Sequence, residues 1–327
     1  MRVSVVIPLY NKAKYITRTL RSVASQTFED FETIIVDDGS TDGSGELAAG
    51  FPDRRFQVLH QANAGPGAAR NRGIEEAHGE VIALLDADDV WMPEYLASSL
   101  AMFDESGPEA AAVASGYVVQ PEGISSEGLW RKRRLKRGIQ RVTPDMSGRE
   151  LAYMAAYMTQ STTAIRKAAC QRWGGYYCKN SCRYAEDTAF CLKVLLNEVV
   201  VFQPQPLAHL DFAASQLGRN FAGPRPVEPF LLDPEDVERA CPPELLPLLR
   251  RYYAHCACKT ATVLGVWGDT AAARSLVRQY VRANNTRPAF LLMALFACTP
   301  AAHMLGRVIL RSSIASCQRG KPLWDVK

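Results

Sequence analysis

One stretch of the sequence decides the fold class: residues 81–93 read Val-Ile-Ala-Leu-Leu-Asp-Ala-Asp-Asp-Val-Trp-Met-Pro. Its first five residues are apolar and follow a glycine, which is typical of a short strand buried on both faces, as in a parallel sheet. Three carboxylates, Asp86, Asp88 and Asp89, come directly after that run. Because ligands of open α/β sheets bind at the carboxyl ends of strands, we expect a functional site here.

The three carboxylates need a partner. Like charges this close repel and raise one another's pKa unless a cation or hydrogen-bond donors hold them. A hard divalent cation, Mg2+ or Mn2+, is the natural partner of such oxygen ligands. The alternative is that Asp89 caps a helix that begins at Pro93 and buries Leu96, Leu100 and Phe103. Capping accounts for only one carboxylate, so the metal interpretation is favoured.

The order of apolar runs predicts the rest of the architecture. Strands are expected at residues 3–7, 31–36 and 56–60, and helices between them, the first with Ile16, Leu20 and Val23 on one face. This βαβαβαβ order predicts an α/β protein with a doubly wound, mostly parallel sheet. Beyond residue 235 the pattern is helical, over 245–267, 270–283 and 288–311. We therefore expect a catalytic domain over residues 1–230 and a helical region over 231–327.

Composition narrows the function classes. The chain has 327 residues, of which 47% are hydrophobic and 22% charged, so wholesale disorder is excluded. The net charge of +4 does not indicate nucleic-acid binding. A strand begins at Val3, which leaves no room for a signal peptide and predicts a cytoplasmic protein that starts at Met1. The nine cysteines lack zinc-ribbon spacing and are expected to be reduced.

A second acidic strand end follows residues 31–36. The loop begins with Asp37 and Asp38 and continues through Gly, Ser and Thr to Asp42. These residue types are typical of turns. Alternatively, an acid at a strand end accepts hydrogen bonds from the base or ribose of a nucleotide. The second acidic strand end some fifty residues later favours the functional interpretation.

Four motifs in succession resemble those of family 2 glycosyltransferases, which have the GT-A fold. They cover roughly residues 3–93 and read Pro8-Leu9-Tyr10-Asn11, Val36-Asp37-Asp38-Gly39-Ser40-Thr41-Asp42, Asn63-Ala64-Gly65 with Ala69-Arg70-Asn71, and Leu85-Asp86-Ala87-Asp88-Asp89. The resemblance implies a nucleotide-diphosphate sugar as donor. It further implies a divalent metal, Mg2+ or Mn2+, that bridges the donor's diphosphate.

The resemblance also implies roles for single residues. Asp37 and Asp38 would contact the base and ribose, and Asp86 and Asp88 would bind the metal. Pro8, Tyr10 and Ala87, which belong to the same motifs, would also contact the donor. Arg70 would lie near the base or the phosphates, unless it is a helix-surface cation.

The resemblance continues with Gly174-Gly175 followed by Glu186-Asp187. In the family the Asp of this pair is the general base, which here is Asp187. Inverting sugar transfer needs such a carboxylate, because the acceptor hydroxyl loses its proton as it attacks the anomeric carbon. Both acids are also expected in the first turn of a helix, where they would favour its dipole. A third metal ligand in many GT-A enzymes is a late histidine, matched here by His209, although the motif around it is degenerate and a packed or surface histidine is favoured.

Two segments have several interpretations. Seven basic residues lie within residues 131–141, which is typical of a solvated loop but would also suit an anionic membrane surface or phosphates. The apolar run at residues 290–297 is too short to span a bilayer. We expect it to pack on the catalytic domain or on a second subunit, giving a homo-oligomer; the alternative is peripheral contact with the inner face of a membrane.

The sequence thus predicts a metal-dependent, inverting glycosyltransferase of the hexosyltransferase type. It would act on a carbohydrate or lipid-linked acceptor in polysaccharide or glycoconjugate synthesis. A sugar nucleotidyltransferase is the first alternative, but such enzymes usually have a Gly-rich loop after the first strand, where this chain has residues 8–11. The second alternative is a nucleotide-sugar-binding protein without turnover, which leaves the complete set of acids unexplained.

Overall fold

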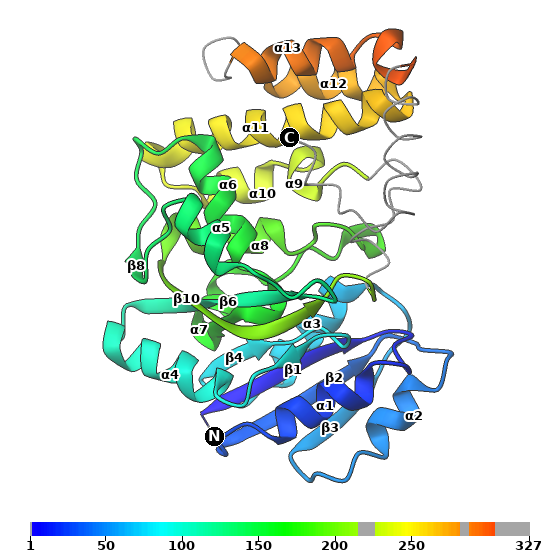
Figure 1. The fold of residues 1–327 in the computed structure, drawn as a ribbon, viewed down its shortest axis with the longest axis vertical. Coiled ribbons are helices and arrows are strands. Elements are labelled where there is room, and N and C mark those ends of the chain that lie inside the picture. The colour runs from blue at the N-terminus through cyan, green and yellow to red at the C-terminus, as the bar shows by residue number, and fades with distance from the viewer. Residues whose placement is uncertain (1, 215–225, 282–287, 305–327) are drawn as a thin grey trace. The chain divides into compact units, whose positions relative to one another are not determined.

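The computed structural model describes residues 2–214, 226–281 and 288–304. The chain divides into two compact units (Figure 1). Unit 1 comprises residues 1–144, 153–219 and 228–245, and unit 2 comprises 145–152, 220–227 and 246–327. The division at residue 230 that the sequence suggests stays a prediction. The last residue of unit 1 along the chain is Leu245.

Unit 1 contains the predicted parallel sheet. Strand β1 (Val3–Leu9) pairs in parallel with β2 (Phe31–Asp37) and with β4 (Val81–Leu84), and β2 pairs in parallel with β3 (Phe56–His60). The crossovers are α1 (Ile16–Ala24), α2 (Ser44–Ala49) and α3 (Pro66–Glu76). The α/β class and the mostly parallel sheet are therefore confirmed, and the carboxyl ends of β2 and β4 lie along one edge, on either side of β1.

Both faces of β1 are buried, as a central strand requires. Val5 and Ile7 belong to the same core cluster as Ile16 and Leu20 of α1. On the other face, α3 approaches so closely that a Cβ atom on Gly73 would lie 2.4 Å from Cγ1 of Val6. Only glycine lets the helix pack at this distance, which fixes α3 and the side chains that follow from it.

The second half of the sheet contains a strand that the sequence did not reveal. Strand β9 (Thr163–Arg166) lies between β4 and β6 (Ala110–Gln120) and is antiparallel to both. Beyond β6 lies β10 (Val199–Asp211), which is parallel to β6 and continues through Pro204 and Pro206 with register shifts. Three short antiparallel strands complete the sheet, namely β5 (Val90–Trp91), β7 (Ile124–Ser125) and β8 (Gly138–Gln140).

The remaining helices of unit 1 pack on this half or on one another. They are α4 (Tyr95–Ser106), α5 (Glu127–Lys132), α7 (Lys167–Trp173), α8 (Thr188–Asn197), α9 (Pro229–Leu232) and α10 (Glu235–Ala240), with short 3-10 turns at Gln160–Thr162, Lys179–Ser181 and Pro243–Leu245. Helix α6 (Gly148–Tyr157) contributes residues to both units. Leu96, Leu100 and Phe103 of α4 are buried, as predicted.

Several side chains of the basic segment, residues 131–141, have partners within unit 1. Arg137 pairs with Glu105 at 3.2 Å and Arg141 with Glu109 at 2.8 Å. The guanidinium of Arg133 lies 4.4 Å from the ring centroid of Tyr153. These contacts account for several of the seven charges without an external partner.

Unit 2 is helical, as predicted. It contains α11 (Leu246–Trp267), α12 (Thr270–Tyr280) and α13 (Pro288–Ala297). The expected continuation of the last helix to residue 311 lies partly outside the described residues. Among the described helices, none combines the length and apolar composition needed to cross a membrane.

Candidate active site

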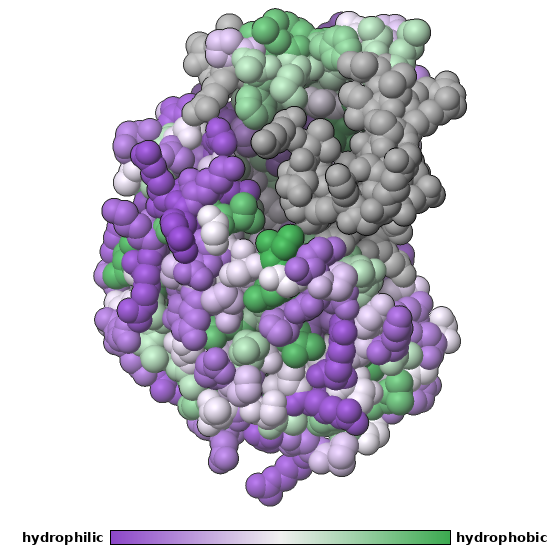
Figure 2. All heavy atoms as spheres, viewed as in Figure 1, coloured by the Kyte–Doolittle hydropathy of each residue, from purple (hydrophilic) through white to green (hydrophobic). Residues whose placement is uncertain are grey.

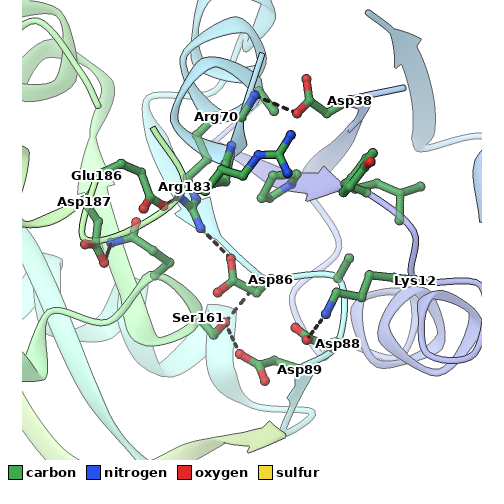
Figure 3. A pocket seen from close by; sticks show the side chains of 18 of the residues that line it. Lys12, Asp38, Arg70, Asp86, Asp88, Asp89, Ser161, Arg183, Glu186 and Asp187 are labelled. Carbon is green, nitrogen blue, oxygen red and sulfur yellow. Dashed lines mark hydrogen bonds and ion pairs between the residues drawn. The ribbon is translucent and has the colours of Figure 1, made fainter. Parts of the chain in front are cut away.

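A cavity of about 660 Å³ opens in unit 1 at the carboxyl edge of β1, β2 and β4. Loops from distant parts of the chain line it, and Figure 3 shows Glu186 and Asp187 on one side, Lys12 and Asp88 on the other, and Asp86 between them. Of the residues named from the sequence, the lining includes Pro8, Tyr10, Asp38, Arg70, Asp86, Ala87, Asp88 and Asp187.

Two cations hold the loop after β4 at Asp88. Lys12 Nζ lies 2.6 Å from Oδ2 of Asp88 and also donates to the carbonyl oxygen of Ala214 at 3.0 Å. Arg18 Nη2 donates to the carbonyl oxygen of Asp88 at 2.7 Å and pairs with Asp211 at 2.6 Å. The loop is therefore tied to the end of β10 through side chains from the start of the chain.

The carboxylate of Asp89 connects this loop to Ser161 and to the end of β10. Its Oδ2 accepts from Ser161 Oγ at 2.5 Å and its Oδ1 accepts from the backbone N–H of Asp211 at 2.8 Å. Ser161 Oγ in turn accepts from the N–H of Asp86 at 3.1 Å. Helix α4 begins at Tyr95, after β5, so the alternative that Asp89 caps this helix is wrong. Asp89 instead fixes the backbone from which Asp86 projects.

Arg70 connects the two acidic motifs. Its Nη2 lies 2.8 Å from Oδ1 of Asp86 and its Nη1 lies 2.6 Å from Oε1 of Glu186. The arginine is 4% exposed, so it is not a helix-surface cation. Burial lowers its pKa, but Asp86 and Glu186 outweigh that effect and raise it. Arg70 is therefore a permanent charge between the carboxylates of residues far apart in sequence.

The cavity keeps an excess of negative charge at its base. Burial raises the pKa of Asp89 well above its usual range, and the charges of Asp86 and Asp88 raise it further. Burial and Asp86 also raise the pKa of Asp88, against the opposing effect of Lys12. Lys12 and Arg70 thus do not fully satisfy the three acids, and a further cation would be favoured here.

The residues present fit a divalent metal with two protein ligands. Arg70 takes one oxygen of Asp86 and Lys12 takes one oxygen of Asp88, which leaves each carboxylate a second oxygen with no hydrogen bond from another described residue. Mg2+ is commonly held by one or two carboxylates together with substrate phosphates. Within the described ranges, no group of three or more His, Cys, Asp or Glu could hold a metal ion. Phosphate oxygens and water would have to supply the remaining ligands.

The two acids of the loop after β2 have different surroundings. Asp38 lines the cavity, and its carboxylate accepts from the backbone N–H groups of Ala64 and Gly65 at 2.8 and 2.9 Å. Asp37 is not among the lining residues; it accepts from the Ser40 N–H at 3.0 Å and lies 3.0 Å from Nδ1 of His60. Asp37 thus forms the turn, and Asp38 is the acid that faces the cavity.

Asp187 lies at the N-cap of α8 but makes no capping hydrogen bond with its side chain. Its Oδ2 accepts from Gln160 Nε2 and its Oδ1 from Thr188 Oγ1, both at 3.2 Å. Glu186 lies before the helix and binds Arg70, and α8 has no acid in its first turn, so the expected first-turn position of both acids is wrong. Of the pair, Asp187 is the carboxylate without an ion pair among the described residues.

Some placements differ from the sequence-based expectations, and some could not be foreseen. His209 pairs with Val90 across β10 and β5 and is not among the lining residues, so its role as a metal ligand stays a prediction. Arg183 also lines the cavity and donates to Asn63 Oδ1 at 2.8 Å. Lys12, next to the first motif, could have been suspected. Ser161 gives no such signal, because it precedes the unforeseen strand β9.

Replacing Arg70 by methionine should strongly destabilise unit 1. Arg70→Met removes the charge but keeps much of the apolar stem, and it leaves Glu186, which is 7% exposed, without its cation. Breaking such a buried pair from one side costs about 3–5 kcal/mol of unfolding free energy, measured by urea denaturation. Arg141→Met is the control, because its pair with Glu109 is exposed and should contribute no more than about 1 kcal/mol.

The loss of unfolding free energy in Arg70→Met should also depend on pH. Burial already raises the pKa of Glu186, and Arg70 opposes that shift. Without Arg70 the folded-state pKa rises further above the unfolded value, so the folded variant binds the extra proton and gains stability as the pH falls. The difference in unfolding free energy between wild type and Arg70→Met should therefore become smaller from pH 8 to pH 5. A constant difference would mean that lost packing, rather than the unpaired carboxylate, destabilises the variant.

Comparisons of the sequence find related proteins. The model of the family described as glycosyl transferase family 2 matches residues 4–173. An uncharacterized glycosyltransferase of Nostoc sp., alr2836, is 44% identical over 109 residues, which are 32% of this chain and 34% of that protein. The poly(ribitol-phosphate) beta-N-acetylglucosaminyltransferase TarS of Staphylococcus aureus is 28% identical over 202 residues, which are 60% of this chain and 33% of TarS. The chain covers about a third of the length of these relatives.

Solved structures show the same fold. Residues 1–349 of TarS in complex with UDP-GlcNAc match with a TM-score of 0.63 at 20% identity, covering 96% of this chain and 92% of that one. The mannosyltransferase PcManGT of Pyrobaculum calidifontis, in complex with GDP-Man and Mn2+, matches with a TM-score of 0.55 at 19% identity, covering 94% and 86%. At these identities the similarity concerns the GT-A fold alone.

Proposed function

Since the chain belongs to glycosyl transferase family 2, we propose that it moves a sugar, with inversion, from a nucleotide-diphosphate sugar to a hydroxyl of a carbohydrate or lipid-linked acceptor. Family membership decides against the sugar nucleotidyltransferase alternative. One observation carries the proposal: a single cavity is lined by Asp38, the pair Asp86 and Asp88, and Asp187. These groups suit the base or ribose, the diphosphate with its metal, and the acceptor, respectively.

The donor end of the cavity suits a nucleotide diphosphate. Asp38 would accept from the base or ribose, and Tyr10, 38% exposed with Arg183 5.8 Å from its ring centroid, offers a flat apolar surface to the base. Asp86 and Asp88 would hold Mg2+ or Mn2+, which would neutralise charge on the departing diphosphate. The nearby charges of Lys12 and Arg183 favour the same anion.

The acceptor end needs a base. Asp187 would accept the proton of the acceptor hydroxyl while that oxygen attacks the anomeric carbon from the face opposite the diphosphate. Gln160 and Thr188 donate to the two carboxylate oxygens of Asp187, which holds the group in one orientation. Attack from that face would invert the anomeric carbon, because base and leaving group would act on opposite faces of the sugar.

The proposal is tested by donor binding and hydrolysis. UDP-GlcNAc and GDP-Man, which the similar structures contain, are the first donors to assay, followed by other nucleotide sugars. Calorimetry with Mn2+ should detect one donor that binds saturably, and that donor should be hydrolysed slowly without acceptor. A protein that binds donor with no turnover under any condition would support the non-catalytic alternative, and one that binds none would overturn the proposal.

Asp38→Ala should raise the KM for the donor by about 10- to 100-fold and change kcat little. The reason is that a charge-assisted hydrogen bond to base or ribose, present in both ground and transition states, contributes about 1.5–3 kcal/mol. Asp37→Asn is the comparison, since Asp37 lies outside the cavity lining and should leave the donor KM nearly unchanged. An unchanged donor KM in Asp38→Ala would mean that this loop serves only as a turn.

A further inference from the structure

Helix α13 has its side chains arranged in the reverse of the usual way. It buries small residues, with Ala294 at 0% and Ala297 at 1% exposure. Four of its six large apolar side chains face solvent, namely Leu292 at 68%, Met293 at 50%, Leu295 at 49% and Phe296 at 44%, whereas Phe290 and Leu291 are half-buried. Figure 2 shows green spheres gathered over α13. We call these four residues the α13 face.

Packing within unit 2 explains why the large side chains point outward. A Cβ atom on Gly265 of α11 would lie 2.1 Å from the carbonyl oxygen of Ala297, so the backbones of α11 and α13 are in close contact. Such an approach leaves room only for glycine and alanine on the inner side. The exposure of the α13 face therefore follows from how the helix is held, and a contiguous apolar patch of this kind marks an interaction site.

The charge of this region indicates what covers the face. From residue 246 to the end, the sequence contains twelve Lys and Arg but only two acids, Asp269 and Asp325; five of these basic residues and Asp269 lie among the described residues. The preceding 245 residues are therefore negative overall, although the whole chain has a net charge of +4. Arg274 and Arg278 line a hollow on α12, and Arg274 Nη1 donates to the carbonyl oxygen of Cys298, just beyond α13. Basic side chains thus border the α13 face.

We propose that the α13 face and its flanking arginines bind an anionic lipid bilayer, with α13 lying in the interface. Ten residues of helix extend only about 15 Å, half of the hydrocarbon core, so the helix would lie along the surface rather than cross it. An apolar face with basic neighbours is the combination that binds such a surface. A second copy of the chain suits the face poorly, because two strongly basic regions would be brought together.

The experiment is sedimentation of the full-length protein with vesicles. Vesicles of phosphatidylcholine with about 30% phosphatidylserine should bind the protein at low salt, and pure phosphatidylcholine vesicles should bind it far more weakly. Leu292→Glu with Phe296→Glu should weaken binding at least tenfold, because two apolar side chains that would enter the bilayer are lost. Arg274→Glu with Arg278→Glu should weaken it about thirtyfold, from roughly fivefold for each arginine.

Matched variants in unit 1 provide the controls. Leu232→Glu with Leu47→Glu changes two apolar residues of similar exposure, 68% and 47%, and Arg21→Glu with Arg54→Glu changes two exposed arginines. Both controls should sediment like the wild type, and all variants should retain the wild-type circular dichroism. Equal binding to both kinds of vesicle would overturn the proposal. So would a dimer in light scattering that the α13 variants dissociate, since that would identify a second copy as the partner.

Discussion

Asp187→Asn should lower kcat by about 10²- to 10⁴-fold, the usual contribution of a positioned general base. Asparagine is nearly isosteric: its amide oxygen can accept from Gln160 while its amide N–H donates to the hydroxyl of Thr188, so both contacts can be kept, but the amide cannot take the acceptor proton. Donor affinity should stay within about twofold, because Asp187 acts on the acceptor alone. Steady-state kinetics together with calorimetric donor binding would measure both quantities.

Glu186→Gln is the control for this result, and the structure changes what it should do. Glu186 is buried against Arg70, so the variant should lose about 1–3 kcal/mol of unfolding free energy through a weakened charge-assisted bond. Its kcat should fall far less than that of Asp187→Asn. A collapse of kcat in Glu186→Gln, with none in Asp187→Asn, would assign the base to the other member of the pair.

Removing divalent metal should lower the rate of transfer by about a thousandfold or more. Charge stabilisation of a diphosphate leaving group by a metal contributes several kcal/mol, and each 1.4 kcal/mol is about tenfold in rate. Assays in EDTA should show this loss, and added Mn2+ or Mg2+ should restore activity. Full activity in EDTA would show that Lys12 and Arg70 suffice as cations.

Two substitutions test whether the metal dependence arises at Asp88. Asp88→Asn should weaken Mn2+-dependent donor binding, because the neutral amide is a poorer ligand and also loses its pair with Lys12. Asp53→Asn removes a comparable ion pair, with Arg55 at 2.6 Å, from a residue that does not line the cavity. It should leave the metal dependence unchanged, so equal effects in both variants would assign the change to lost ion pairing.

The first half of the fold was predictable because its signals are local. Buried runs such as residues 3–7 and 81–84 and the apolar face of α1 are regular patterns, and the carboxylates after β2 and β4 mark the edge where the cavity lies. Strand β9 has only four residues and no alternation that distinguishes it from a loop. Its position between β4 and β6 depends on long-range pairing, which periodicity does not encode.

The candidate site was predictable as a set of acids but not as a network. Residue types and motif order indicate Asp38, Asp86, Asp88 and Asp187. The contacts of Arg70 could not be foreseen, since Glu186 lies 116 residues further along the chain. The α13 face was also hidden, because the sequence shows an apolar run but not which side of it packs against α11.

The long-range character of the site has a consequence for folding. Lys12 and Asp88 are separated by 76 residues, Arg70 and Glu186 by 116, and Arg18 and Asp211 by 193. Contacts at such separations form late, because closing long loops costs chain entropy before the contacts repay it. A truncated chain that ends at residue 173 would lack Glu186 and Asp211, so Arg18 and Arg70 would lose those partners. Such a fragment should contain every donor motif and still fail to assemble the cavity.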